Sequence, residues 1–230
     1  MEKLTYKKFY SLIKEDPSWA SRLTEPIEVI EYCAMENINI THLSPLLYFT
    51  GKNHKNEVAT FAFCYKLKVA EGNFDGFVNF EFSRIEKIGD LNITQASTEG
   101  NAVDFNNCPF LRIATGTYPG LVCFGTTGIE KIENLFIKSP NIYGIAALFY
   151  DCCNLRVARG NFPGDVDFSS CGIEAIQDFQ ALSGSFTNCK YLKRIPKELL
   201  NESFQFDPRL TQKWTEIYKI QDSIRNIDIL

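Results

Sequence analysis

Phe105-Asn-Asn-Cys108-Pro-Phe-Leu111 is the stretch that decides the fold, because the chain repeats this pattern of Phe, Cys and Leu at a constant spacing. The pattern also starts 44 residues earlier, at Phe61, and 44 residues later, at Phe149 (61 to 105 to 149), and a shortened copy starts at Phe186. Positions downstream keep the same step: Gly72/Gly116/Gly160, Phe74/Tyr118/Phe162, Gly76/Gly120/Gly164, Phe80/Phe124/Phe168, Ile85/Ile129/Ile173 and Ile88/Ile132/Ile176. Self-similarity at a fixed period predicts a solenoid, in which each unit buries its apolar face against its neighbours.

Each 44-residue block divides into two related halves that share the pattern Leu-x-x-apolar-x-apolar. The pattern starts at eight positions, 16 to 24 residues apart: Leu43, Leu67, Ile88, Leu111, Ile132, Leu155, Ile176 and Leu192. With Phe-x-x-Cys-x-x-Leu upstream, residues 38–200 resemble the irregular bacterial leucine-rich repeats of the BspA type. The resemblance implies an α+β solenoid, a right-handed superhelix of about eight units. The chain departs from that family where small Ala and Gly residues occupy alternate units and where the usual asparagine is missing.

The small residues and the glycines predict the shape of each coil. Ala70 and Gly72, with their equivalents in later blocks, leave interior room for the aromatic side chain of Phe74 and its equivalents. Pro119-Gly120 and Pro163-Gly164 predict type II turns, in which glycine takes the positive φ. We expect three short alternating pieces along another side of the coil: Val78-Asn-Phe80, Val122-Cys-Phe124 and Val166-Asp-Phe168.

Both ends of the chain predict helical caps, because a solenoid exposes its last apolar layer unless something covers it. The expected division is a helical N-terminal cap over residues 1–37, the solenoid over 38–200 and a capping helix within 201–230. Residues 3–35 are expected to be helical, with a second helix after Pro26 that carries Ile27, Ile30 and Cys33 on one face. Asp207-Pro208 is expected to start the last helix, whose apolar stripe is Leu210, Trp214, Ile217 and Ile224. We expect this helix to be a lid; the alternative is a docking element for a partner.

Composition limits the classes of function. The chain has 230 residues, a net charge of −4 and a pI near 5.4, which argues against non-specific binding of nucleic acid. No stretch approaches the length of an apolar membrane span. The first ten residues also lack the apolar run of a secretory signal. We therefore expect no membrane association and a cytoplasmic protein, unless a route without such a signal exports it.

The eight cysteines predict packing rather than metal or disulfide chemistry. Cys64, Cys108, Cys152 and Cys189 recur in phase with the repeat, so they are expected to stack in the core as small apolar side chains. Cys171 stands where the other blocks have Ser83 and Thr127, a position that requires only a small side chain. The chain has no Cys-x-x-Cys and only two histidines, so neither a cofactor nor a metal is expected. It also lacks the common catalytic motifs, and it is not expected to be an enzyme.

Charge is the periodic surface feature. Lys68, Arg112, Arg156 and Lys193 each follow the first Leu of a repeat and predict a basic row; Glu86, Glu130 and Glu174 predict an acidic row. The two rows either face solvent and each other, as pairs that contribute about 0–1 kcal/mol each, or the basic row contacts an acidic partner or a phosphate backbone. By analogy with leucine-rich repeats, the middle residues of each strand are expected to form the binding face, with an exposed apolar line of Val69, Ile113, Val157 and Phe136.

Two functional hypotheses follow. The first is a non-enzymatic protein–protein interaction module, acting as an intracellular bacterial or phage-encoded effector or inhibitor that holds a partner protein on its repeat surface. The second is binding of nucleic acid, or of a nucleoprotein enzyme, through the basic row. The candidate partner-binding residues are Lys68, Val69, Glu71, Asn92, Arg112, Ile113, Thr115, Asn134, Phe136, Arg156, Val157, Arg159, Gln180 and Arg194.

Overall fold

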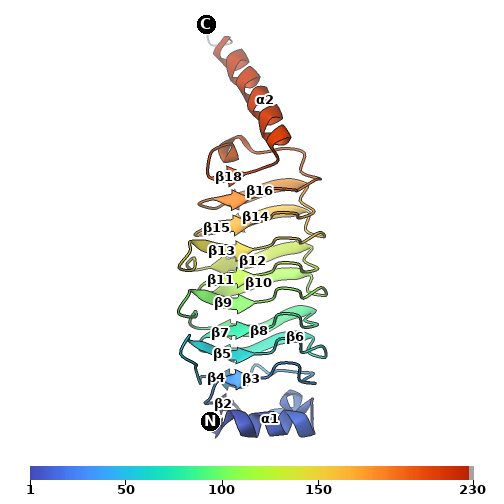
Figure 1. Ribbon diagram of the computed structural model, residues 1–230, viewed down its shortest axis with the longest axis vertical. Helices are drawn as coiled ribbons and strands as arrows, with labels where there is room; N and C mark the ends of the chain where they lie inside the picture. The colour runs from blue at the N-terminus through green and yellow to red at the C-terminus, as the bar shows by residue number, and fades with distance from the viewer. Residues whose placement is uncertain (228–230) are drawn as a thin grey trace.

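The chain forms a parallel β-solenoid of about nine coils (Figure 1). The solenoid that the 44-residue period predicts is therefore confirmed, with about nine coils where eight units were expected. The structure, a computed structural model, describes residues 1–227, with side chains to Ser223. The strand pairs between successive coils are parallel throughout this part of the chain. The coils stack along the long axis of the molecule, with α1 (Tyr6–Glu15) across one end and α2 (Pro208–Ile227) extending beyond the other (Figure 1).

One side of the column is built by two N-terminal strands, β1 (Glu2–Leu4) and β2 (Ile27–Val29), and by strands from the Leu-x-x-apolar segments. They form one five-stranded and two two-stranded sheets: β1, β2, β4 (Leu47–Phe49), β6 (Val69–Phe74) and β8 (Lys87–Ile93); β10 (Ile113–Tyr118) and β12 (Lys131–Ile137); β14 (Val157–Asn161) and β16 (Ala175–Gln180). The eighth pattern start, Leu192, leads to the 3₁₀ turn η2 (Lys197–Leu199) and not to a strand.

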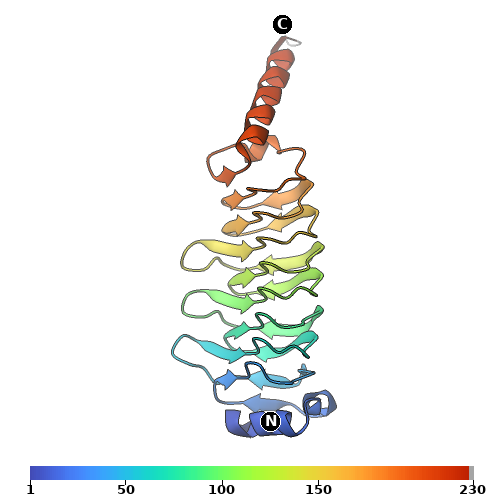
Figure 2. The same cartoon turned by 45° about the vertical axis from the view of Figure 1, so that its right-hand side comes forward.

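The second side of the column is a single nine-stranded sheet. Its strands are β3 (Cys33–Ala34), β5 (Glu57–Thr60), β7 (Phe77–Asn79), β9 (Asn101–Asp104), β11 (Leu121–Cys123), β13 (Ile145–Leu148), β15 (Asp165–Asp167), β17 (Gly184–Ser185) and β18 (Phe204–Gln205). Strands β7, β11 and β15 contain the first two residues of each predicted alternating piece, and the closing Phe follows the strand, so the place of these pieces on another side of the coil is confirmed. Loops before β5, β9 and β13 bulge from the column at intervals of two coils (Figure 2).

A ladder of phenylalanine rings runs through the interior. Neighbouring rings stack with centroids 4.9 to 5.6 Å apart, close to the ~4.8 Å separation of strands. The members of this Phe ladder are Phe61, Phe80, Phe105, Phe124, Phe149, Phe168, Phe186 and Phe206. Each of them is at most 7% exposed, so the repeated Phe is a repeated core contact.

The in-phase cysteines are buried beside the Phe ladder, which confirms that they pack in the core. Their thiols donate to main-chain carbonyls of the preceding coil: Cys108 Sγ lies 3.2 Å from the oxygen of Phe80, and Cys152 Sγ lies 3.1 Å from that of Phe124. Burial raises the pKa of the Cys108 thiol to about 11, and Ser83 beside it partly offsets the shift. These thiols therefore add hydrogen bonds between coils as well as filling space.

The predicted type II turns are wrong, and the glycines have a different role. Gly120 and Gly164 do not have positive φ. A Cβ at Gly120 would overlap the carbonyl oxygen of Gly100 in the preceding coil, and Gly164 meets that of Gly144 in the same way. Close approach of two backbones therefore requires glycine there.

Glycines with positive φ lie elsewhere: Gly100 and Gly144, with φ of 84° to 85°, and Gly72, Gly116 and Gly160, with φ between 115° and 129°. The last three share one role. Each sits where the strand register shifts, so that two residues of the next coil oppose one. A Cβ on Gly116 would lie 2.7 Å from the Tyr118 hydroxyl, which confirms that these glycines make room for the aromatic that follows.

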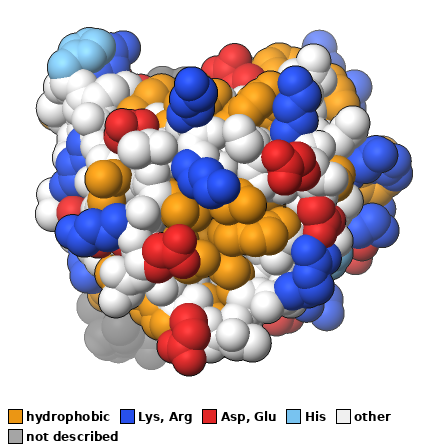
Figure 3. All heavy atoms as spheres, turned by 90° about the horizontal axis from the view of Figure 1, so that it is seen from below, with side chains coloured by type: hydrophobic (Ala, Val, Ile, Leu, Met, Phe, Trp, Pro, Cys, Tyr) orange, Lys and Arg blue, Asp and Glu red, His pale blue; other side chains and the backbone are white. Residues whose placement is uncertain are grey.

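The N-terminal end is only partly helical. Helix α1 and the 3₁₀ turn η1 (Trp19–Arg22) are present, but the second predicted helix is wrong, since residues 27–29 and 33–34 form β2 and β3. Ile27 and Val29 are buried and flank the less buried Glu28, which is the period of two of a strand. The helix was predicted because Ile27, Ile30 and Cys33 are also spaced as on one face of a helix. Strands therefore begin well before residue 38. Seen from this end, Figure 3 shows apolar side chains surrounded by charges of both signs.

The C-terminal helix starts as predicted, at Asp207-Pro208, where Asp207 Oδ1 accepts from the Arg209 amide at 2.9 Å. Its first turns contact the last coil: Trp214 Nε1 donates to the Lys193 carbonyl at 3.0 Å and the Tyr218 hydroxyl donates to that of Ile195 at 2.8 Å. The predicted stripe member Ile224 lies outside the described side chains.

Candidate functional site

The basic and acidic rows pair with each other. Lys68 lies 2.9 Å from Glu86, Arg112 lies 3.6 Å from Glu130 and Arg156 lies 3.7 Å from Glu174. In each pair the glutamate amide also donates to the carbonyl of the basic residue, at 2.7 to 2.8 Å, so the three pairs are structurally equivalent. Because these side chains are about half exposed, each pair contributes about 0–1 kcal/mol. The charges of Arg112 and Arg156 are thus largely balanced within the solenoid.

Two further arginines of the predicted binding set are also engaged. Arg194 Nε donates to the Tyr218 hydroxyl at 3.3 Å, and its guanidinium lies 5.8 Å from the centroid of the Trp214 ring, so α2 holds it. Arg159 lies 3.8 Å from Asp178 on the next strand. These two arginines are therefore separate from the paired row.

The predicted apolar line is interrupted. Val69, Ile113 and Val157 start equivalent strands, but the next coil places Lys87 opposite Val69 and Lys131 opposite Ile113. Phe136, 57% exposed, lies in a different row, opposite Thr117 near the strand ends. The other predicted face residues are spread over the same strands: Glu71, Asn92, Thr115, Asn134 and Gln180. The strand face is therefore mixed and does not form a continuous apolar groove.

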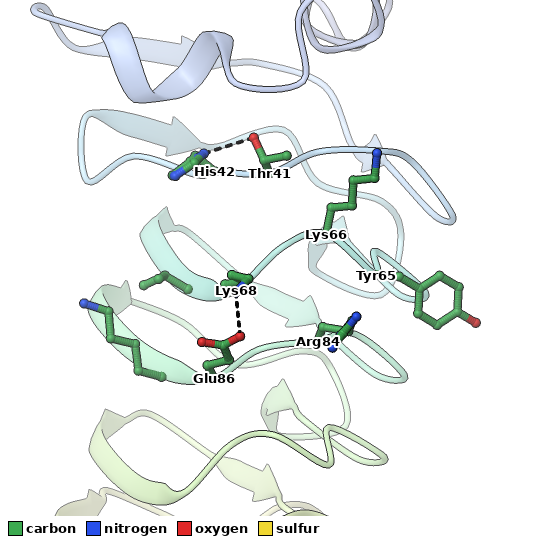
Figure 4. A pocket seen from close by; sticks show the side chains of 9 residues that line it. Thr41, His42, Tyr65, Lys66, Lys68, Arg84 and Glu86 are labelled. Carbon is green, nitrogen blue, oxygen red and sulfur yellow. Dashed lines mark hydrogen bonds and ion pairs between the residues drawn. The ribbon is translucent and has the colours of Figure 1, made fainter.

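A hollow of about 800 Å³ lies beside the start of strands β6 and β8, in the first double repeat (Figure 4). Three successive coils supply its lining, which is Thr41, His42, Tyr65, Lys66, Lys68, Val69, Arg84, Glu86 and Lys87. His42 Nδ1 and Thr41 Oγ1 lie 3.0 Å apart at one end, and Lys68 pairs with Glu86 at the centre (Figure 4). This cationic hollow is the candidate site.

The cationic hollow has an excess of positive charge. Four lysine and arginine side chains line it against one carboxylate, a formal charge of +3 with His42 neutral, on a chain whose net charge is −4. Among the side chains that the structure describes, Lys66, Arg84 and Lys87 make no ion pair. Burial raises the pKa of the nearby Glu71 carboxyl, while Lys87 opposes that shift. The hollow therefore offers unbalanced cations to an acidic group.

One local difference distinguishes this repeat from the later ones. In the second and third blocks, the arginine of the basic row lies over a glycine: Arg112 Nη1 donates to the Gly128 carbonyl and Arg156 Nη1 to that of Gly172, both at 3.3 Å. The first block has Lys68 in place of that arginine and Arg84 in place of that glycine. Arg84 lies instead with its guanidinium 4.6 Å from the centre of the Phe110 ring.

Of the residues around the hollow, the sequence pattern indicated Lys68, Val69 and Glu86. It did not include Lys66, Arg84 and Lys87, because it consists of side chains that recur. The signal that would have found Arg84 is its departure from the repeat, since residues 84, 128 and 172 are Arg, Gly and Gly.

A second, more mixed hollow lies on the third block, where Arg156, Lys190 and Tyr191 meet Asp151 and Cys153. Within the described residues, no three His, Cys, Asp or Glu side chains are grouped to hold a metal ion. In the same residues, no helix combines the length and apolar character that crossing a bilayer requires. Comparison with models of protein families, with curated proteins and with solved structures gave no match.

Proposed function

We propose that the protein is a non-enzymatic binding module that holds an acidic surface of a partner protein in the cationic hollow. The observation that supports this proposal is the cluster of unpaired Lys66, Arg84 and Lys87 on a chain that is acidic overall. Complementary charge accelerates encounter and selects the partner. Such a module would act as an effector or inhibitor by occupying a surface of its partner. In this proposal α1 and the base of α2 cover the two ends of the solenoid.

The test is capture of partners from native cell extract by the wild-type protein and by three double variants of equal charge change. Arg84→Glu with Lys87→Glu removes the cations of the hollow, and Arg112→Glu with Arg156→Glu reverses the paired row. Lys131→Glu with Lys138→Glu is the control, because both side chains are exposed and lie away from the hollow.

We expect one acidic protein to be captured by the wild type, by the control and by the row variant, and to be lost with the hollow variant. Loss with the row variant alone would favour the second hypothesis, a surface that follows the basic row. Equal capture by all four proteins would contradict the proposal.

A further inference from the structure

Each coil turns after its strand in the nine-stranded sheet through a residue with positive φ. In the later blocks these residues are polar: Asn107, Thr126, Asp151 and Ser170, with φ of 55° to 58°. In the first block the same two positions are Phe63, with φ of 59°, and Phe82, with φ of 56°. Asn and Asp tolerate this conformation because they bond locally, whereas bulky aromatic and β-branched residues are strained in it. Thr126 therefore shares the strain of Phe82, and the contrast between blocks is that of Phe63 with Asn107 and Asp151.

The strain at Phe63 and Phe82 is not offset by burial in the core. Each side chain is 38% exposed, and the two rings stack on each other at 4.8 Å, nearly parallel. The polar residues of later coils make the same turn without exposing a ring. The stacked pair is a contact between neighbouring coils, but it leaves both rings at the surface. Backbone strain of this kind clusters at functional surfaces.

The exposed ring pair continues into the cationic hollow. The Tyr65 ring, 55% exposed, lies 6.4 Å from that of Phe63 and lines the hollow, pointing outward from it (Figure 4). Phe110, 37% exposed, lies beneath the guanidinium of Arg84. Aromatic surface and unpaired cations therefore form one patch.

We propose that this patch takes an extended acidic segment of the partner whose apolar side chains pack against Phe63 and Phe82 while its carboxylates meet Lys66, Arg84 and Lys87. The inference rests on the proposed function and names the partner's chemistry. A short peptide suits the patch better than a single-stranded nucleic acid. Phe63 and Phe82 stack on each other, so one face of each ring is already occupied and is not free to stack on a base. A polyanion with a charge on every unit would also be repelled by the net charge of −4 on the protein.

The experiment measures binding of three labelled probes by fluorescence anisotropy: a decapeptide of alternating Glu and Phe, one of alternating Glu and Ser, and a ten-nucleotide oligothymidylate. We expect the Glu–Phe peptide to bind at least about tenfold tighter than the Glu–Ser peptide. Phe63→Asn with Phe82→Thr, which installs the residues of the second block, is expected to abolish that difference. The control, Asp151→Asn with Ser170→Thr, changes the equivalent turns of the third block and is expected to bind as the wild type does.

Melting temperature checks that the double Phe variant is folded. Phe63→Asn relieves one strained turn, and loss of the stacked ring pair costs about 0.5–1.5 kcal/mol, so we expect its melting temperature to lie within about 6 °C of the wild-type value. Equal affinity for the two peptides, an unchanged preference in that variant, or tighter binding of the oligothymidylate would overturn the inference. If the Glu–Ser peptide binds as tightly as the Glu–Phe peptide and Arg84→Glu with Lys87→Glu weakens both, the inference fails and the proposed function stands. If that variant weakens neither, the proposed function itself fails.

Discussion

Replacement of Phe124 by alanine tests whether the Phe ladder is the shared core of the solenoid. Phe124 is fully buried, and its ring stacks between those of Phe105, at 5.5 Å, and Phe149, at 5.3 Å. Removing a buried Phe costs about 3–5 kcal/mol, and two lost ring contacts of about 0.5–1.5 kcal/mol each place this variant in the upper half of that range. For a chain of this length, we expect a fall in melting temperature of about 10–20 °C.

The assay is urea unfolding followed by circular dichroism, with Phe206→Ala as the matched control. Phe206 ends the ladder, has one stacked neighbour at 5.1 Å and is 7% exposed, so its loss is expected to cost at most about 3 kcal/mol. A solenoid is stabilised by contacts between neighbouring coils, so the defect in the middle removes contacts on both sides. If Phe124→Ala costs no more than Phe206→Ala, the reasoning from stacked rings is refuted.

Two further predictions concern backbone approach and pH. Gly120→Ala is expected to lower the free energy of unfolding by at least about 2 kcal/mol, because its Cβ would overlap the Gly100 carbonyl. Gly144→Ala is expected to lower it by about 1 kcal/mol, because its φ is positive but no atom obstructs the Cβ. Thermal unfolding of both variants checks this order. Burial raises the pKa of the Asp104 carboxyl to about 6, and nearby Glu81 adds to the rise. The folded protein therefore binds this proton more tightly than the unfolded chain does. Its stability falls as the pH rises from about 4 through 6. Asp104→Asn is therefore expected to stabilise the fold at pH 7.5 by up to about 3 kcal/mol and to lose this advantage by pH 4, as urea midpoints at the two pH values would show; an advantage independent of pH would contradict the assignment to this carboxyl.

The period alone predicted the stacking of coils, because every coil must present the same buried side chains to the next. It did not predict the register between the two halves of a block. Sequence matching aligned Ala70 with Leu91, whereas the structure pairs Ala70 with Ile88 and Gly72 with Leu91. The difference comes from a bulge, an extra residue in one strand that an apolar pattern cannot distinguish from a shift of the whole strand.

The local conformation of the turns also could not be predicted from the sequence, although these turns lie beside the candidate site. Phe63 lies two residues after the core residue Phe61, and in a sequence it looks like one more apolar residue of a strand. Comparison of its φ with that of Asn107 distinguishes the two, because asparagine tolerates this positive φ whereas phenylalanine is strained by it. In a repeat protein, recurring residues are already explained by the contacts between coils. The residues that break the repeat at Phe63, Phe82 and Arg84 lie together. They contact neighbouring coils through the Phe63–Phe82 stack and the Arg84–Phe110 contact. The later blocks nevertheless form the same coils with polar residues and glycine at these positions, so stacking of coils does not require the aromatic and cationic side chains.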